Sequence, residues 1–223
     1  MTYRVIPTSH SDAALDAATD AVAAGEVIVL PTDTVYGVGA DASSAAAVQK
    51  LLDAKRRGRD VPPPVLVAEV AMARALATGT DDRLTRLADA FWPGALTVIL
   101  TARATLRMDL GDRGATVAVR VPDHGFTREL LRRTGPLAVS SANVHGREAA
   151  LSVADAIEQL GDACALYLDD GEASGAVPST IVDLTGSRAR ILRHGRLSAA
   201  DLNAAVPGLI ADAAPPDAAD DEV

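Results

Sequence analysis

Hydroxyl, carboxylate and amide side chains gather in two segments that follow apolar runs of strand length. Thr32, Asp33 and Thr34 come after the run 27–30, and Ser141 and Asn143 come after the run 137–139. Open α/β sheets bind ligands beyond the ends of their strands, so this placement predicts a polar ligand site. The competing interpretation, that the hydroxyls only cap backbone turns, stays open for Ser141.

Cations occur where they could meet an anionic ligand. Lys55 and Arg57 lie in a basic run at the end of a predicted helix, where they either pair with the helix C-terminus or clamp phosphates. Arg120 ends a strand of small and apolar residues, and a buried guanidinium there needs a carboxylate or phosphate partner. Arg193 repeats this pattern at the end of a later strand.

Three common catalytic signatures are absent or weak. No GxxxxGK[ST] run occurs, so ATP would bind without a P-loop. The residues from Gly37 to Ala42 match G-x-G-x-x-A, but six residues separate Leu30 from Gly37, too many for a dinucleotide fingerprint. Ser141 lacks the G-x-S-x-G context of a serine hydrolase. Nicotinamide binding and serine hydrolysis are therefore disfavoured.

Composition favours one globular domain of about 200 residues. The 223 residues are 48% hydrophobic and 23% charged, and no apolar run is long enough for a membrane helix. With one cysteine and four scattered histidines, neither a disulfide nor structural zinc is expected. The net charge of -9 argues against a whole-surface nucleic-acid binder. We expect a cytoplasmic protein with no membrane association.

Strand and helix patterns alternate along the chain, with several strand pairs lacking a helix between them, which predicts a mixed sheet. We expect helices over 11–24, 44–56, 70–77, 81–91, 124–133, 152–160 and 198–205. We expect strands over 27–30, 64–68, 95–101, 115–121, 137–139, 164–168, 180–184 and 189–193, with a loop over 31–39. The expected domain covers residues 1–206. Residues 207–223, rich in Ala, Asp and Pro, are expected to form an acidic disordered tail.

Seven segments, in order between about residues 10 and 206, resemble the YrdC family, and within it the threonylcarbamoyl-AMP synthases (TsaC-like). They are Leu30 to Gly39 (LPTDTVYGVG), 54–57 (AKRR), 91–97 (FWPGALT), 117–122 (VAVRVP), 140–143 (SSAN), 178–183 (PSTIVD) and 192–195 (LRHG). A single segment would be a weak hint. Seven in family order make the resemblance strong.

The resemblance implies a fold and a reaction. The fold is the three-layer YrdC/RibB-like α/β (α+β) arrangement, in which helices flank a twisted mixed sheet with a concave groove. The reaction is that of an L-threonylcarbamoyladenylate synthase, a nucleotidyltransferase that converts L-threonine, bicarbonate and ATP into threonylcarbamoyl-AMP, pyrophosphate and water. The product serves the N6-threonylcarbamoyladenosine modification of tRNA at position 37 (t6A37).

The resemblance also implies residue roles. The threonine-binding positions match Thr34, Arg120, Val139 (through its backbone) and Ser179. The ATP-binding positions match Lys55, Arg57, Thr116, Ser141, Asn143 and Arg193. Lys55 and Arg57 are the catalytic candidates, because they could neutralise charge that grows on the phosphates. No metal ligand is expected, and Mg²⁺ would be carried by the ATP phosphates.

This sequence departs from many relatives at two places. The segment from Gly58 to Pro63 is about two residues longer, which leaves phosphate contacts around Pro62 and Pro63 open, and Ala68 aligns with a threonine-contacting histidine. Two other functions stay open: carbamoyl transfer from carbamoyl phosphate, and an RNA-binding module. The expected partner is a threonylcarbamoyl transferase complex that takes over the adenylate; direct tRNA contact is possible but not required.

Overall fold

The computed structural model describes residues 3–112, 114–173, 175 and 177–211. Its helices are α1 (Ser11–Ala23), α2 (Ala45–Ala54), α3 (Val70–Leu76), α4 (Asp82–Phe91), α5 (Gly125–Thr134), α6 (Val153–Leu160) and α7 (Ala199–Ala205), with a 3-10 turn at Gly161–Ala163. Its strands are β1 (Arg4–Pro7), β2 (Ile28–Leu30), β3 (Gly37–Asp41), β4 (Val65–Leu66), β5 (Leu96–Thr101), β6 (Thr116–Arg120), β7 (Leu137–Ser141), β8 (Leu166–Asp169), β9 (Thr180–Asp183) and β10 (Arg190–Arg193).

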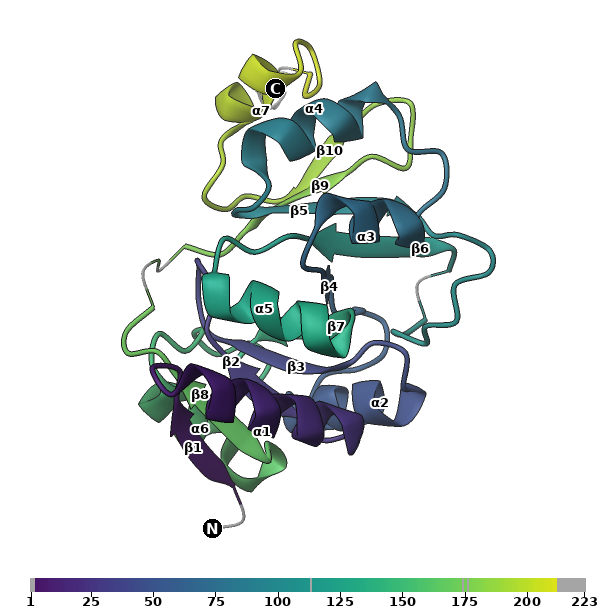
Figure 1. Cartoon of the computed structure of the whole chain (residues 1–223). Coiled ribbons are helices and arrows are strands. Elements are labelled where there is room, and N and C mark those ends of the chain that lie inside the picture. The colour runs from purple at the N-terminus through teal and green to yellow at the C-terminus, as the bar shows by residue number, and fades with distance from the viewer. Residues whose placement is uncertain (1–2, 113, 174, 176, 212–223) are drawn as a thin grey trace, which may run out of the picture.

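Over the described residues the strands join in one sheet with the order β1-β8-β2-β3-β7-β4-β6-β5-β9-β10 (Figure 1). The sheet contains parallel pairs, such as β4 with β6 and β5 with β9, and antiparallel pairs, such as β3 with β7. The predicted mixed sheet is confirmed. Its central strands β7, β4 and β6 bring the ends of segments that are far apart in the sequence into one region.

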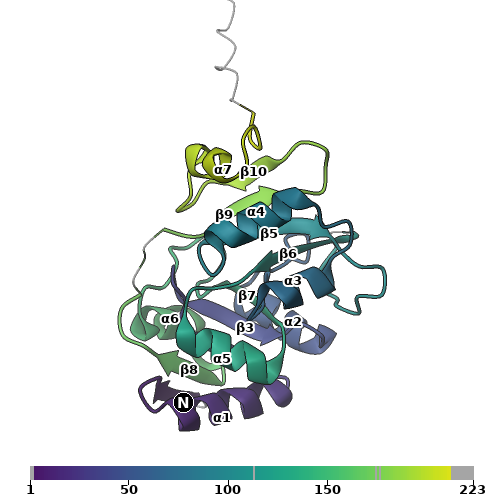
Figure 2. The same ribbon diagram turned by 45° about the horizontal axis from the view of Figure 1, so that its top comes forward.

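Helices cover both faces of the sheet, because the strands bury side chains on both sides. Along β2, Ile28 and Leu30 pack with residues of α1 and α5, whereas Val29 packs with residues of α2 and α6 on the other face. Figures 1 and 2 show α1 beside α5, and α4 together with α7 near β9 and β10. The expected three-layer arrangement is confirmed.

The loop predicted over 31–39 is wrong at its end, because Gly37 begins strand β3. Strand β3 lies close against the Val139 side chain of β7. An ideal Cβ atom would lie 2.7 Å from that side chain at Gly37 and 3.2 Å from it at Gly39, so the absence of a Cβ atom at these two positions favours the pairing of β3 with β7. Glycines disfavour strands in isolation, and here the pairing on both sides of β3 overrides that preference.

The two ends of the chain also differ from the expectation. Strand β1 is not predicted from the sequence, because it is an edge strand with mostly exposed residues, and β8 is its only partner among the described strands. At the other end, Leu209 is buried and Asn203 exchanges hydrogen bonds with the backbone of Ile210, so ordered packing extends beyond residue 206. The tail prediction for 212–223 lies outside the described residues.

Among the described helices, none has the length and apolar character to cross a membrane.

Candidate functional site

A buried ion pair forms the centre of the candidate threonine site. Asp33 and Thr34 lie in the loop after β2, and Arg120 is the last residue of β6. Arg120 Nη2 donates to Asp33 Oδ1 at 2.6 Å, its Nη1 to Thr34 Oγ1 at 3.0 Å, and its Nε to the carbonyl of Gly94 at 2.9 Å. Burial lowers the pKa of Arg120, and the Asp33 carboxylate opposes that shift. Asp33 thereby fixes the guanidinium and offsets the cost of burying it.

Ser179 lies just before β9 in a second buried cluster. Its hydroxyl is 2.8 Å from Thr97 Oγ1 of β5, and Arg193 Nη2 donates to Ser179 Oγ and Ser179 O at 2.9 Å. Burial, followed by repulsion from Arg120, lowers the pKa of Arg193. The structure therefore brings Arg193, expected at ATP, against Ser179, expected at threonine.

Gly195 packs against the backbone of Ser179 in this second cluster. An ideal Cβ at this position would lie 2.5 Å from both Ser179 C and Thr180 N. The following residue donates its N–H to the Pro178 carbonyl at 3.0 Å. The turn after β10 thus lies directly on the peptide groups that orient Ser179, and only glycine leaves room for it.

Lys55 lies at the end of α2 with its side chain only 1% exposed. Its Nζ donates to the carbonyl of Ser141, and to the Asn143 carbonyl and Oδ1 at 2.7 and 3.1 Å. Burial, with a smaller contribution from the Arg57 charge, lowers the pKa of Lys55 to about 7. The structure thus places the Lys55 side chain against the Ser141–Asn143 turn.

The lowered pKa of Lys55 predicts how stability depends on pH. Between about pH 7 and 10 the unfolded chain binds a proton that the folded protein has released. The free energy of unfolding should therefore rise with pH in this window, by up to about 1.4 kcal/mol per pH unit. The variant Lys55→Met should lack this rise. Denaturant titrations at pH 7, 8 and 9 measure it, and equal slopes for the two proteins would contradict it.

Arg57 follows α2 and reaches the end of β7. Its Nη1 donates to Ser140 Oγ at 3.1 Å and its Nη2 to the Pro62 carbonyl at 3.1 Å. The side chain is half-buried and lies between the basic segment and the Ser140–Asn143 turn. Arg57 thus joins the basic segment to the end of β7.

The other two predicted site residues, Thr116 and Val139, lie within strands β6 and β7. Thr116 is exposed at the start of β6, four residues from Arg120, beside a cavity of about 330 Å³ that Pro62 also lines. Val139 is buried, with its N–H donating to the Pro64 carbonyl, so its side chain belongs to the core. Ala68 is fully buried in the core cluster that includes α1 and α5. The structure thus offers no sign of a threonine contact at Ala68.

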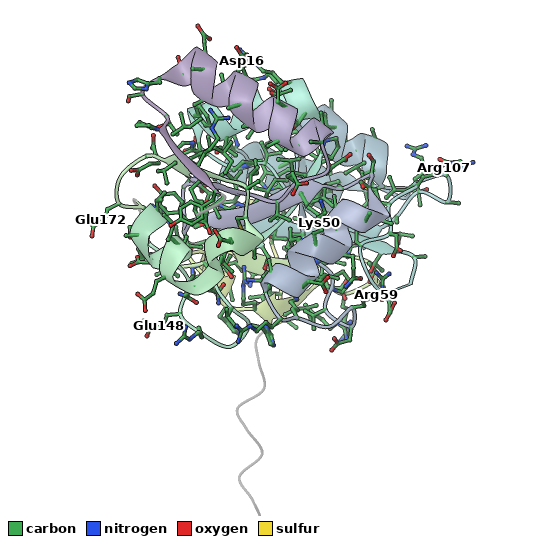
Figure 3. The ribbon with its side chains drawn as sticks, turned by 90° about the horizontal axis from the view of Figure 1, so that it is seen from below. Asp16, Lys50, Arg59, Arg107, Glu148 and Glu172 are labelled. Carbon is green, nitrogen blue, oxygen red and sulfur yellow. The ribbon has the colours of Figure 1, made fainter. Side chains whose placement is uncertain are left out.

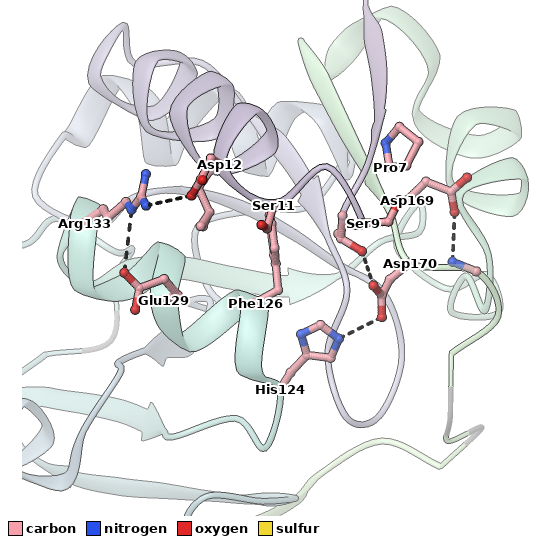
Figure 4. A pocket seen from close by; sticks show the side chains of 13 residues that line it. Pro7, Ser9, Ser11, Asp12, His124, Phe126, Glu129, Arg133, Asp169 and Asp170 are labelled. Carbon is pink, nitrogen blue, oxygen red and sulfur yellow. Dashed lines mark hydrogen bonds and ion pairs between the residues drawn. The ribbon is translucent and has the colours of Figure 1, made fainter.

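An open cavity of about 930 Å³ lies between β1, α1, α5 and the end of β8, and no predicted site residue lines it. Figure 4 shows its side chains pairing with one another: His124 with Asp170, at 3.1 Å between Nε2 and Oδ2, and Arg133 with Asp12 and Glu129. These polar groups already have partners within the protein. The volume therefore marks a hollow between elements and not the predicted site.

Sequence reasoning missed three supporting residues: Asp33 as the partner of Arg120, Thr97 as the partner of Ser179, and Gly195. Arg120 predicted an unnamed acidic partner, and Asp33 stood in the polar loop already singled out, so pairing the two was within reach. Thr97 gave no such signal, because a threonine in a strand is ordinary. Gly195 could be understood only from the backbone it touches.

Comparisons with known proteins agree with this arrangement. Residues 20–195 match the profile of the Sua5/YciO/YrdC family, described as "Telomere recombination". A putative threonylcarbamoyl-AMP synthase of Mycobacterium tuberculosis is 48% identical over 181 residues, 81% of this chain and 83% of the relative. The threonylcarbamoyl-AMP synthase of Bacillus subtilis is 33% identical over 81% of this chain and 53% of its own.

Among solved structures, P. abyssi Sua5 complexed with L-threonine superposes with a TM-score of 0.84 at 30% identity. The match covers 88% of this chain and 58% of that longer one, so this chain spans less than two thirds of Sua5. Because the family profile covers most of the chain and the M. tuberculosis relative matches over a similar span, the assignment is clear. The chain belongs to the Sua5/YciO/YrdC family.

Proposed function

We propose that this protein is an L-threonylcarbamoyladenylate synthase that acts in the t6A37 modification of tRNA. The observation that carries the proposal is the 48% identity with the M. tuberculosis relative of that name over most of both chains. Sua5, a structural neighbour, is complexed with L-threonine. The buried Arg120 and Ser179 clusters supply a guanidinium and hydroxyls suited to an amino acid carboxylate and polar side chain.

The proposed chemistry needs no protein nucleophile. The threonine amine attacks the bicarbonate carbon and water leaves, giving a carbamate. A carbamate oxygen then attacks the α-phosphorus of ATP as the bond to the leaving pyrophosphate breaks. The protein contributes positioning and charge neutralisation. Arg57 is our candidate for neutralising the phosphates, with Ser141 and Asn143 binding the nucleotide, and the class of the enzyme would be nucleotidyltransferase.

ATP is a substrate in this scheme, and Mg²⁺ would enter on its phosphate oxygens. Among the described residues, no group of three or more His, Cys, Asp or Glu side chains is placed to hold a metal ion. Asp33, the carboxylate nearest to the candidate site's centre, is engaged with Arg120. The product would pass to a threonylcarbamoyl transferase complex; direct tRNA contact is not required.

Pyrophosphate release from ATP tests the function. The purified protein is assayed with and without bicarbonate, and with L-threonine, L-serine, no amino acid, or carbamoyl phosphate. Release that depends on both threonine and bicarbonate is expected. Release that depends on carbamoyl phosphate would favour carbamoyl transfer instead, and no release in any arm would favour the RNA-binding alternative.

The variant Arg57→Ala should raise the KM for ATP by about 10- to 100-fold, because a charge-assisted hydrogen bond contributes about 1.5–3 kcal/mol. The KM for threonine should change little. Arg56→Ala is the matched control, since Arg56 is an exposed neighbour on the same segment. An unchanged KM for ATP in Arg57→Ala would return this cation to a purely structural role at the helix end.

A further inference from the structure

We propose that Lys55 is a positioning residue: it holds the Ser141–Asn143 turn in shape for the nucleotide from beneath, and contacts no phosphate itself. The inference rests on the proposed function, because it names the residue that keeps the nucleotide-binding turn in order. It differs from the role that the family resemblance implies for Lys55.

The terminal nitrogen of Lys55 is fully engaged by the turn. Below about pH 7, where Lys55 is protonated, its Nζ has three N–H donors, and they meet three oxygens: Ser141 O, Asn143 O and Asn143 Oδ1. A phosphate oxygen could bind only by displacing one of them, and would have to reach a nitrogen on a side chain that is 1% exposed. The displaced oxygen would then lose its donor, which is costly.

The main chain of Lys55 reinforces the same turn. Its carbonyl accepts the N–H of His145 at 2.8 Å. The side chain of Lys55 thus binds Ser141 and Asn143, and its main chain binds the residue two positions after Asn143. On the far side, Gln159 of α6 accepts the N–H of Val144 at 3.1 Å and donates to the Glu148 carbonyl at 3.1 Å. The segment after β7 is thus tied to two helices, and Lys55 is the anchor nearest to Ser141 and Asn143.

Lys55 also sets the orientation of the two polar side chains. Asn143 Oδ1 accepts from Lys55 and from Ser141 Oγ, the latter at 2.5 Å, while Asn143 Nδ2 donates to the Arg147 carbonyl at 2.6 Å. The amide can satisfy all of these contacts in one orientation only. Removing the Lys55 donor therefore takes away one of the contacts that hold the amide, and leaves it to Ser141 Oγ and the carbonyls of Val144 and Arg147.

Two measurements on the full chain test this role. Lys55→Met keeps the apolar stem of the side chain and removes the N–H donors. Lys50→Met is the control, because Lys50 lies on helix α2 outside the candidate site (Figure 3). The Lys50 side chain is 49% exposed. In nucleotide-free protein, amide hydrogen exchange of residues 142–147 should increase at least about 10-fold in Lys55→Met, and should stay unchanged in Lys50→Met. A phosphate ligand would leave nucleotide-free exchange unchanged, which would overturn the proposal.

The second measurement is a double-mutant cycle on the KM for ATP. Lys55→Met and Asn143→Ala should each raise this KM about 10-fold, and the double variant should be no worse than either, because both act through one turn. Lys55→Arg should fail to rescue, since a guanidinium does not fit among the three oxygens. Additive losses, or rescue by arginine, would identify a direct phosphate contact.

The outcomes separate this inference from the proposed function. If wild-type protein released no pyrophosphate, the synthase assignment would fail, but hydrogen exchange and the ATP dissociation constant would still test the role of Lys55. If Lys55→Met does not fold, Lys55→Gln, which keeps an N–H donor without a charge, replaces it in both measurements with the same expected direction.

Discussion

Replacing Asp33 with alanine should destabilise the protein by about 3–5 kcal/mol, the usual cost of removing one partner of a buried ion pair. Arg120 is 6% exposed and Asp33 is its only ion-pair partner among the described residues, so the variant would leave a buried guanidinium without a counter-charge. Asp33 also accepts the backbone N–H of Asp123 at 3.1 Å, which would be lost too. Urea unfolding, monitored by circular dichroism, gives the free energy of unfolding.

Two controls separate the ion pair from general effects of mutation. The double variant Asp33→Ala with Arg120→Met should recover part of the stability, because it removes both charges, yet it should still bind threonine poorly. Asp82→Ala breaks an exposed pair with Arg86 and should cost less than about 1 kcal/mol. A loss in Asp33→Ala no larger than that in Asp82→Ala would contradict the importance of the buried pair.

Gly195→Ala should lower kcat/KM for threonine by about 100-fold, the loss typical of a displacement of about 1 Å in a positioned group. The added methyl group would overlap the peptide groups on both sides of Ser179, and backbone cannot move aside as a flexible side chain can. Ser179 Oγ would then lose its alignment with Thr97 and Arg193. The loss should appear mainly in the dependence of the reaction rate on threonine concentration.

Gly125→Ala is the matched control for Gly195→Ala. An ideal Cβ at Gly125 has no neighbour within 4 Å, and the residue opens α5, where alanine is well tolerated. Its kinetics should match those of the wild-type protein. If Gly195→Ala retained wild-type kinetics for threonine, the turn after β10 would have no part in orienting Ser179.

Much of this fold and site could be predicted from sequence, for identifiable physical reasons. The apolar stretch of β2 and the periodicity of α1 report burial directly, so both elements were predicted to within a few residues. Arg120 was recognisable because a cation at the end of an apolar strand needs a partner. The motif order supplied the family, which the profile match confirms.

The features that escaped prediction depend on contacts across the chain. In strand β3, Gly37 and Gly39 lie close against the Val139 side chain, a contact that no local preference encodes. The acceptors of Lys55 lie 86 and 88 residues away, so the sequence shows a lysine at a helix end and not what it binds. The burial of Lys55 against the Ser141–Asn143 turn could therefore not be predicted from the residues around it in the sequence.

The position of β1 has a consequence for how the protein is made. Its only partner among the described strands is β8, and residues 4–7 pair with residues 166–169. During synthesis the first strand therefore leaves the ribosome long before its partner exists, and β2 also forms its contact with β8 only after residues 166–167 have been made. Ser179 and Arg193 emerge later still. The nascent chain must therefore remain soluble with incomplete sheet edges until most of it has been synthesised, and can have no complete site before then.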